Sequence, residues 1–379
     1  MSLTPEMTTA LTPELQIPDI LLGTVVAVQA NFYQVKLEPR DYPDSLADNS
    51  LDNSTFLLCT RRSRLKKMGQ QVMVGDRVVV EEPDWQGGRG AVAAVLPRRS
   101  FLDRPPIANV DQVLIVFALE DPSLDAYQLS RFLVKAESTG LKVNICLNKS
   151  DLVSPSAIET WRQRLQGWGY EPKFLSVLKN TGLEELNKEL SDRITVLAGL
   201  SGVGKSSLIN YLIPDTNLRV AAVSGKLQKG RHTTRHVELF DLPQGGLLAD
   251  TPGFNQADVD CFPRDLITYF PEARERLEQG ECQFSDCSHC HEPNCVVRGD
   301  WERYAHYVQF LEEANIYADQ IHHQRHQESS TKSKSKKGKQ GEEPKLEMKK
   351  YRQVSRRKQQ QSLQDFHQQN RYQEQEDYD

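Results

Sequence analysis

Residues 193–212 read RITVLAGLSGVGKSSLINYL, and this stretch decides the fold of the middle of the chain. A β-rich apolar run leads into a glycine-rich loop, and the loop leads into a run with helical periodicity. The loop from Gly199 to Ser206 matches the G-x-x-x-x-G-K-[ST] pattern of a phosphate-binding loop. Both flanking elements that this motif requires are present, which disfavours the alternative of a glycine turn without a ligand.

The loop predicts how a nucleotide is held. Its glycines let successive backbone N–H groups face the phosphates, Lys205 neutralises the β- and γ-phosphate oxygens, and the Ser206 hydroxyl ligates Mg²⁺. Lys205 is therefore also a predicted catalytic residue. The predicted nucleotide contacts along the loop are Gly199, Leu200, Ser201, Gly202, Val203, Gly204, Lys205, Ser206 and Ser207.

The tetrapeptide Asn148-Lys149-Ser150-Asp151 predicts that the base is guanine. Asp151 can accept from the two N–H donors on the Watson–Crick edge of guanine, whereas adenine would leave this carboxylate unpaired. We expect Asn148 to support the loop and the purine, and the Lys149 stem to pack on the ring. A backbone N–H at Ser176 or Val177 is expected to meet guanine O6. A P-loop ATPase or kinase remains the alternative if Asp151 does not contact the base.

Two later segments are predicted to sense the γ-phosphate. Asp250-Thr-Pro-Gly253 supplies a carboxylate for the Mg²⁺ shell and a Gly253 N–H for the phosphate, although the same residues also suit a simple turn. In the segment at residues 230–235, we expect Thr233 to join the Mg²⁺ shell and assign both Thr233 and Thr234 to catalysis, with either threonine open as the ligand.

The motifs occur in an unusual order along the chain: base motif, phosphate loop, threonine segment and Asp-containing turn. Ordinary GTPases place the base motif last. Strand-like and helix-like runs alternate around these motifs, so we expect a parallel sheet with both faces covered. Together these features predict a circularly permuted α/β P-loop GTPase domain over residues 98–265.

The segments before and after this domain differ from it. Residues 18–97 hold about five short β-rich runs separated by turn residues, which predicts an all-β barrel of the OB-fold type. A basic stretch at residues 61–67 suits either RNA contact or a solvated loop. Residues 1–17 and 321–379 show little apolar periodicity, and we expect a disordered lead-in and a disordered charged tail.

Residues 266–320 combine a cysteine cluster with a run of helical periodicity, which predicts a helical metal-binding domain. Three thiolates and one imidazole, from Cys282, Cys287, His289 and Cys295, form a closed tetrahedral set suited to structural zinc. Spacing alone does not exclude Cys290 as a ligand in place of a neighbour. A catalytic metal is disfavoured, because a full protein ligand set leaves no open position.

Taken together, these motifs make the sequence similar to the RsgA family of circularly permuted GTPases, also called YjeQ or EngC. The resemblance runs from about Leu21 to Asn315 and rests on GDRVVVE, RPPIANVDQVLIVFA, NKSD, GLSGVGKSSLIN, GRHTTR, DTPGF and the cysteine block. It implies an N-terminal OB-fold, a permuted GTPase domain and a zinc domain, acting on the small ribosomal subunit and its rRNA late in maturation. It also implies that Cys290 is not among the zinc ligands.

A further feature is the residue that positions the attacking water. Phe254 follows the Asp-containing turn, where many GTPases carry a glutamine that orients this water. The resemblance suggests His232 for this role, and the alternative is a solvated loop histidine. A nucleic-acid-binding scaffold that holds GTP and hardly hydrolyses it is therefore a second functional hypothesis.

The composition and charge of the chain limit which partners and which cellular compartment we expect. The net charge is −5, yet residues 332–358 carry twelve Lys or Arg against three Glu, so the rest of the chain is strongly acidic. Seven cysteines without an apolar secretory segment favour metal ligation in the cytoplasm over disulfides. No apolar run approaches the roughly 20 residues that span a bilayer. We expect a monomer that binds GTP and GDP and no membrane.

Overall fold

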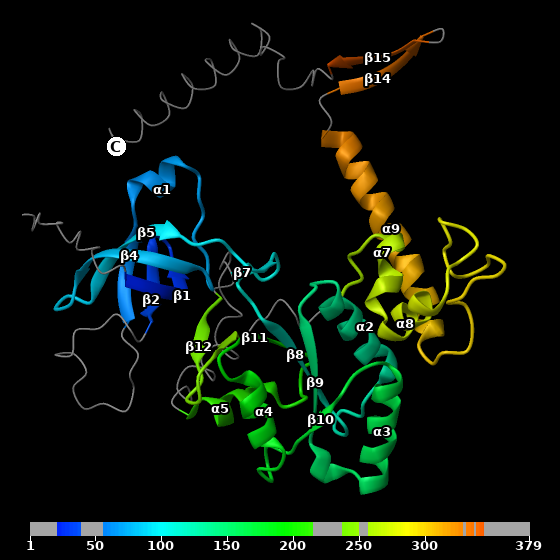
Figure 1. The fold of residues 1–379 in the computed structure, drawn as a ribbon, viewed down its shortest axis with the longest axis horizontal. Coiled ribbons are helices and arrows are strands. Elements are labelled where there is room, and N and C mark those ends of the chain that lie inside the picture. The colour runs from blue at the N-terminus through cyan, green and yellow to red at the C-terminus, as the bar shows by residue number, and fades with distance from the viewer. Residues whose placement is uncertain are drawn as a thin grey trace, which may run out of the picture. The chain divides into compact units, whose positions relative to one another are not determined.

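The computed structural model describes residues 21–38, 56–214, 237–249, 257–328, 331–336 and 339–344. Figure 1 shows an N-terminal barrel, a central sheet with helices and a helical C-terminal region. The chain divides into one unit of Met1–Tyr317 and a second of Ala318–Asp379. Among the described residues, no helix combines the length and the apolar character needed to cross a membrane.

The N-terminal strands close into a five-stranded barrel with neighbours in the order β1-β2-β3-β5-β4. Its strands are β1 (Leu21–Gln29), β2 (Phe32–Leu37), β3 (Phe56–Arg61), β4 (Arg77–Asp84) and β5 (Arg89–Val95). Buried and more exposed residues alternate along β2 and β3, because successive side chains point into and out of the barrel. The short helix α1 (Ser63–Lys67) lies between β3 and β4. The predicted OB-fold barrel is confirmed.

The central sheet has six strands in the order β10-β9-β8-β11-β13-β12. They are β10 (Lys173–Phe174), β9 (Lys142–Asn148), β8 (Gln112–Ala118), β11 (Ile194–Ala198), β13 (Leu247–Ala249) and β12 (Leu239–Asp241). Every neighbouring pair is parallel except β12 with β13. A short hairpin of β6 (Phe101–Leu102) and β7 (Ile107–Ala108) precedes the sheet.

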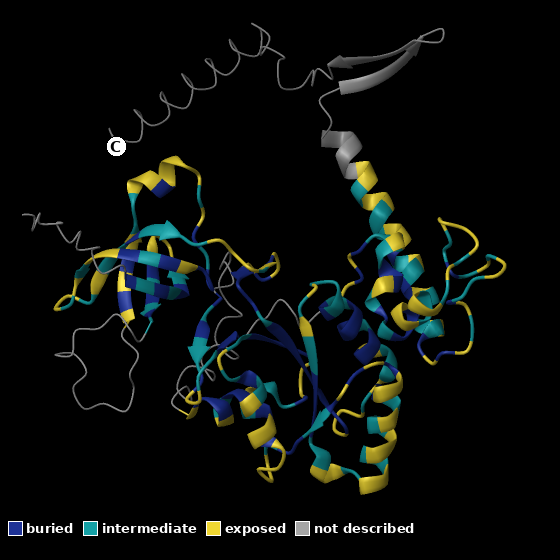
Figure 2. Ribbon diagram, viewed as in Figure 1, coloured by how far each residue is buried: buried dark blue, intermediate teal, exposed yellow. Residues whose placement is uncertain are grey.

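Helices cover both faces of this sheet, and every residue of β8 is buried. Figure 2 shows the resulting pattern, with buried strands between helices whose outer surfaces are exposed. Alternate residues of β8 belong to two separate cores: Phe117 packs in the core of α2 (Ala126–Glu137) and α3 (Pro155–Gly167), and Leu114 in that of α4 (Leu183–Leu190) and α5 (Lys205–Leu212). The predicted layered α/β domain is confirmed.

The strands of the base motif and of the phosphate loop come in permuted order but lie in one sheet. Strands β8 to β10 precede β11 in the chain and lie on one side of it, whereas β12 and β13 follow it and lie on the other. Residues 191–193 connect α4 to β11 and so join the two halves.

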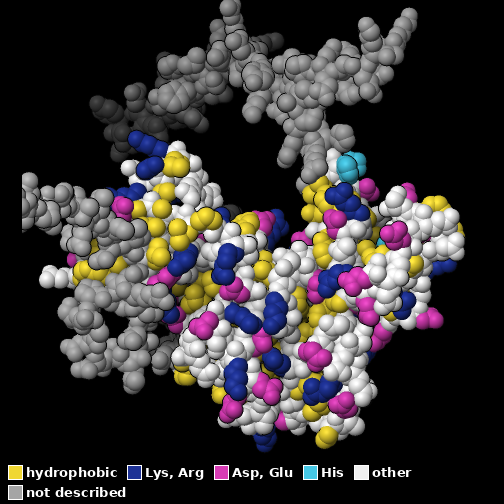
Figure 3. Space-filling view, in the orientation of Figure 1, with side chains coloured by type: hydrophobic (Ala, Val, Ile, Leu, Met, Phe, Trp, Pro, Cys, Tyr) yellow, Lys and Arg dark blue, Asp and Glu magenta, His cyan; other side chains and the backbone are white. Residues whose placement is uncertain are grey.

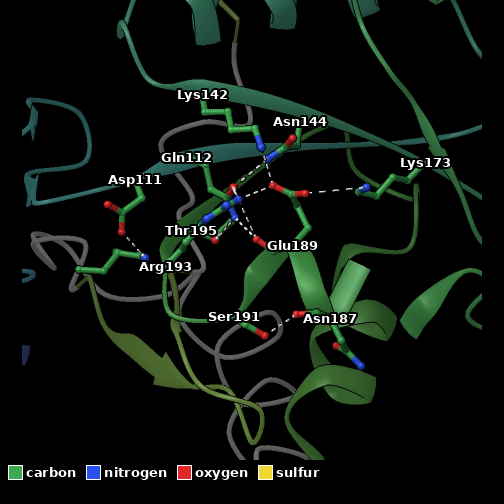
Figure 4. A network of polar contacts seen from close by, with 11 residues as sticks. Asp111, Gln112, Lys142, Asn144, Lys173, Asn187, Glu189, Ser191, Arg193 and Thr195 are labelled. Atoms are coloured by element: carbon green, nitrogen blue, oxygen red, sulfur yellow. Dashed lines mark hydrogen bonds and ion pairs between the residues drawn. The ribbon is translucent and has the colours of Figure 1, made fainter. Parts of the chain in front are cut away.

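A buried network holds this joint in place (Figure 4). The side chain of Gln112, fully buried at the start of β8, donates to Thr195 Oγ1 at 2.9 Å and to the Glu189 carbonyl at 3.0 Å. Its oxygen accepts from Asn144 Nδ2 at 2.8 Å and from Arg193 Nη1 at 3.0 Å. The amide therefore uses its full hydrogen-bonding capacity and ties three strands to the end of α4.

The C-terminal region is a helical domain around an aromatic core. Its helices are α7 (Pro263–Leu266), α8 (Pro271–Gln279) and α9 (Tyr304–Glu328), with the 3-10 turn η5 (Ile267–Tyr269) between the first two. The core includes Phe270, Trp301, Tyr307 and Phe310. This domain contacts the GTPase domain where Trp168 Nε1, after α3, donates to Glu302 at 2.7 Å.

The structure describes two elements at the start of the segment predicted to be a charged tail. Helix α9 continues to Glu328, and β14 (Thr331–Lys336) pairs with β15 (Lys339–Pro344). No proline or glycine interrupts residues 304–328, which favours the long helix. The hairpin is held by antiparallel backbone pairing.

A buried ion pair in the helical domain generates a stability prediction. Arg303 is fully buried, and its Nε donates to Glu272 Oε1 at 2.6 Å, while its guanidinium lies 4.8 Å from the Trp168 and Phe270 ring centres. Replacing Glu272 by Ala leaves a buried charge unpaired, and we expect unfolding to become easier by about 3–5 kcal/mol. Urea unfolding followed by tryptophan fluorescence measures this. The control is Glu275→Ala on the exposed side of α8, and equal effects of the two substitutions would contradict the prediction.

Candidate nucleotide and metal sites

The loop between β11 and α5 has the backbone that a phosphate-binding loop needs. Gly199, Gly202 and Gly204 have φ angles of 143°, 85° and 95°, a region that other residues rarely adopt. A Cβ on Gly199 would lie 2.1 Å from the Val116 carbonyl oxygen, and one on Gly204 would lie 2.3 Å from Asn148 Nδ2. Glycine is thus required here both by conformation and by space.

The charged end of Lys205 lies over the same loop. Its Nζ donates to the carbonyls of Gly199 at 2.7 Å and Leu200 at 2.6 Å. Helix α5 begins at Lys205, and Ser206 and Ser207 are exposed in its first turn. The N–H groups of a first helical turn have no partner within the helix, so this end of α5 can receive an anion.

Asn148 connects three segments that the sequence predicts separately. This buried residue ends β9, and its Nδ2 donates to the Val203 carbonyl of the phosphate loop at 2.9 Å. Its Oδ1 accepts from the backbone N–H of Val177 at 3.4 Å. The structure therefore brings the base motif, the phosphate loop and the segment after β10 together at the carboxyl edge of the sheet.

The other residues of the base motif lie on the surface of this region. Lys149 has a left-handed φ of 58°, and its Nζ contacts the carbonyl and the carboxylate of Asp121. Asp151 lies exposed in the 3-10 turn η2 (Ser150–Leu152).

Residues after β10 complete this edge. Ser176 is buried; its backbone exchanges two hydrogen bonds with Thr181, both at 3.1 Å, and its Oγ accepts from the Lys179 N–H at 3.0 Å. Val177 is half-buried beside Asn148. A tight turn thus holds the two predicted base contacts next to the base motif.

Sequence reasoning missed Asp121, which follows β8 and binds Lys149. The signal that could have found it is its position shortly after the apolar run of β8, since the carboxyl ends of parallel strands share one edge. The predicted His232, Thr233, Thr234, Asp250 and Gly253, and Phe254 with them, lie outside the described residues.

The end of β13 can be placed relative to the phosphate loop. Ala249, the residue before Asp250, pairs with Val196 of β11 in parallel register. Strand β11 ends two residues later at Ala198, and the phosphate loop begins at Gly199. The backbone that leads to the Asp-containing turn therefore lies beside the strand that leads to the loop.

A compact group of metal-ligating side chains lies in the helical domain. The ligand atoms of Cys282, Cys287, His289 and Cys295 all lie within 4.8 Å of one another. His289 Nδ1 is 3.4 Å from Cys295 Sγ and 3.6 Å from Cys282 Sγ. Three sulfurs and one imidazole nitrogen at this separation can hold a single metal ion. Cys290 does not belong to this group.

Surrounding hydrogen bonds fix the loop that carries these ligands. Tyr304 and Tyr307 of α9 donate to the carbonyls of His289 at 2.8 Å and Ser288 at 2.7 Å. The Glu292 carboxylate accepts from the backbone N–H of Ser288 at 2.8 Å, which closes the turn between the ligands. Burial lowers the pKa of His289, which favours the neutral imidazole that a metal requires.

Comparison with known proteins agrees with this geometry. Residues 95–260 match the sequence profile of a family described as RsgA GTPase. A small ribosomal subunit biogenesis GTPase RsgA from Trichormus variabilis is 63% identical, over 92% of this chain and 97% of the relative. The chain belongs to the RsgA GTPase family. An RsgA protein of the same description from Synechocystis sp. is 52% identical, over 91% of this chain and 94% of the relative.

Solved structures of RsgA-like proteins share the fold. YloQ, described as a circularly permuted GTPase, is 30% identical with a TM-score of 0.63, over 80% of this chain and 98% of that one. YjeQ from Thermotoga maritima is 31% identical with a TM-score of 0.61, over 78% of this chain and 98% of that one. The family and the permuted fold predicted from the motif order are thereby confirmed.

The metal cluster predicts different outcomes for two neighbouring cysteines. Cys287→Ser removes one of the four clustered ligands, so we expect the purified protein to lose most of its bound metal. Cys290→Ser is the matched control, because it makes the same chemical change outside the cluster and should leave the metal in place. Elemental analysis after dialysis measures both. Metal retained in the first variant and lost in the second would mean that Cys290 is the true ligand.

Proposed function

We propose that this chain binds GTP at the carboxyl edge of its six-stranded sheet, hydrolyses it to GDP and phosphate, and assists the late maturation of the small ribosomal subunit. The observation that carries the proposal is the Asn148 side chain, which joins the predicted base motif to the phosphate loop through Val203. The printed description of its RsgA relatives as small ribosomal subunit biogenesis GTPases supports the choice of partner.

The proposed roles follow from where each group lies. Lys205 exchanges its two loop carbonyls for β- and γ-phosphate oxygens when GTP binds, and the first turn of α5 faces the same phosphates. Ser206 holds Mg²⁺, together with Asp250 and Thr233, and the ion would neutralise charge on the phosphates. Asp151 accepts from guanine, and the Val177 region meets O6. Gly253 and Thr234 sense the γ-phosphate, and His232 orients the attacking water.

The barrel is the proposed contact for rRNA. Helix α1 carries Arg64, Lys66 and Lys67 in its last turn. Figure 3 shows Lys and Arg side chains over this connection, with hydrophobic side chains on the same exposed surface. Phe32, which pairs with Thr60 near the end of β3, is 48% exposed, and basic groups beside exposed aromatics suit an oligonucleotide.

The identity of the metal and the oligomeric state of the protein also belong to the proposal. One zinc ion per chain is proposed for the four-ligand cluster, because closed Cys₃His sets are typical of structural zinc. We also propose that the protein works in the cytoplasm as a monomer, with the ribosomal subunit as its macromolecular partner.

Base selection can be tested at Asp151. In Asp151→Asn an amide faces guanine where the carboxylate accepted two hydrogen bonds, so we expect GTP to bind about 10- to 100-fold more weakly. Xanthosine triphosphate, which offers an acceptor where guanine has a donor, should bind better than to the wild type. Asp125→Asn is the matched control, because Asn also caps α2 there. Unchanged GTP affinity in Asp151→Asn would remove this residue from the base site.

Turnover on the ribosomal subunit tests the function itself. We expect slow single-turnover GTP hydrolysis by the protein alone and acceleration of at least about tenfold, or about 1.4 kcal/mol in barrier, by purified small subunits. Lys205→Ala should be inactive in both conditions, and His232→Ala should gain less from subunits than the wild type. If small subunits do not accelerate GTP hydrolysis by the wild type, the proposed ribosomal role is wrong. If they accelerate hydrolysis by His232→Ala as much as by the wild type, the histidine has no part in positioning water.

A further inference from the structure

Strand β12 contacts the barrel as well as the GTPase sheet. Glu238, directly before β12, forms an isolated antiparallel bridge with Ala27 of β1. Asp241, the last residue of β12, forms an ion pair with Lys36 of β2, and the two side chains are 28% and 30% exposed. The edge of the GTPase sheet is therefore joined to the barrel by one backbone bridge and one half-exposed ion pair.

An irregularity in β1 strengthens this junction. The register of β1 with β2 shifts between Val25 and Ala27, so Val26 is an extra residue in the strand. Val25 belongs to the barrel core, whereas Val26 is buried in the core that contains Val237 and Leu239. A β-bulge redirects a side chain in this way. Here it places a barrel residue in the hydrophobic core of the GTPase domain.

The position of β12 in the chain connects this junction to the chemistry. The predicted γ-phosphate segments, residues 230–235 and 250–253, come directly before and after the hairpin of β12 and β13. Leu239 of β12 pairs with Ala249 of β13, and Ala249 pairs with Val196 of β11, which leads into the phosphate loop. Backbone pairs therefore lead from barrel strand β1 through an isolated bridge to the β12–β13 hairpin and on to β11, which precedes the phosphate loop.

We propose that this junction couples the barrel to GTP turnover. A ligand bound to the barrel shifts β1 and β2, and the Lys36–Asp241 pair with the Val26 contact passes the shift to β12. Lys36 and Asp241 are positioning residues, since neither belongs to the predicted nucleotide site. The inference rests on the proposed function for the identity of the ligand. Since the same contacts can carry a change in either direction, we also expect the γ-phosphate to alter the conformation of β1 and β2.

Charge reversal of the pair tests the coupling in the full-length protein. Lys36→Glu and Asp241→Lys should each bind GTP and hydrolyse it without subunits at the wild-type rate. At saturating small subunits, each should lose about fivefold or more of the stimulation, and the double variant with exchanged charges should recover most of it. A purely structural role for the pair would not give selective loss of the stimulated rate together with recovery in the double variant.

A matched control separates coupling from the attraction of rRNA to a basic barrel. Arg77→Glu changes the barrel charge as much as Lys36→Glu, but Arg77 pairs with Glu38 within the barrel. The Arg77→Glu variant should at most bind the small subunit more weakly. At saturating subunits, its GTP hydrolysis should be stimulated as much as that of the wild type. If the Arg77 variant loses as much stimulation, or if the exchanged pair recovers none, the junction is not the route. Should Lys36→Glu fold poorly, Lys36→Gln replaces it.

A second measurement needs no ribosomal subunit. In the wild type, replacing GDP by a non-hydrolysable GTP analogue should change amide hydrogen exchange in β1 and β2, and Lys36→Glu should abolish at least about half of this change. Identical exchange of these strands with both nucleotides in the wild type would overturn the coupling. If subunits fail to stimulate the wild type but exchange responds to the nucleotide, the ribosomal proposal fails while the coupling stands.

Discussion

The carboxamide of Asn148 is the interaction on which the nucleotide site depends. A buried amide must find partners for both its oxygen and its nitrogen, and this one meets the Val203 carbonyl on one side and the Val177 N–H on the other. Its place against Gly204 leaves no space for a Cβ, so the loop glycine and the asparagine constrain each other. The segments predicted to contact the base and the phosphates are thus joined by a single side chain.

This arrangement explains why the motifs can change their order along the chain. What the site requires is that β9 and β11 lie on either side of β8, with all three carboxyl ends at one edge. The order of these strands along the chain does not matter for this requirement, provided that the new connection between them fits into the fold. Gln112 meets this condition, because its four hydrogen bonds fix the start of β11 and the end of α4 at the opposite edge.

The sequence could predict those features that depend on local chemistry. The glycines of the phosphate loop are needed by φ angle and close approach, so their spacing alone indicates the site, and the alternation of strand and helix indicates the layers. Gln112 and the bulge at Val26 could not be predicted, because their roles come from contacts with residues far away in the chain. The exclusion of Cys290 needed the resemblance, since spacing left it open, and the separation of ligand atoms now supports it.

The two flanking domains are attached to the GTPase domain by interactions of different character. The helical domain contacts the GTPase domain at Trp168, which lies beside the guanidinium of the fully buried Arg303 and donates to Glu302 at 2.7 Å. The barrel meets β12 through the buried Val26 and through the Lys36–Asp241 ion pair, which water reaches and which can rearrange at small cost. This ion pair lies beside the half of the sheet that leads to the predicted γ-phosphate segments, whereas Trp168 follows α3 in the half that carries the base motif. A half-exposed pair at this place suits the proposed coupling of the barrel to GTP turnover, because it can rearrange without exposing the buried core.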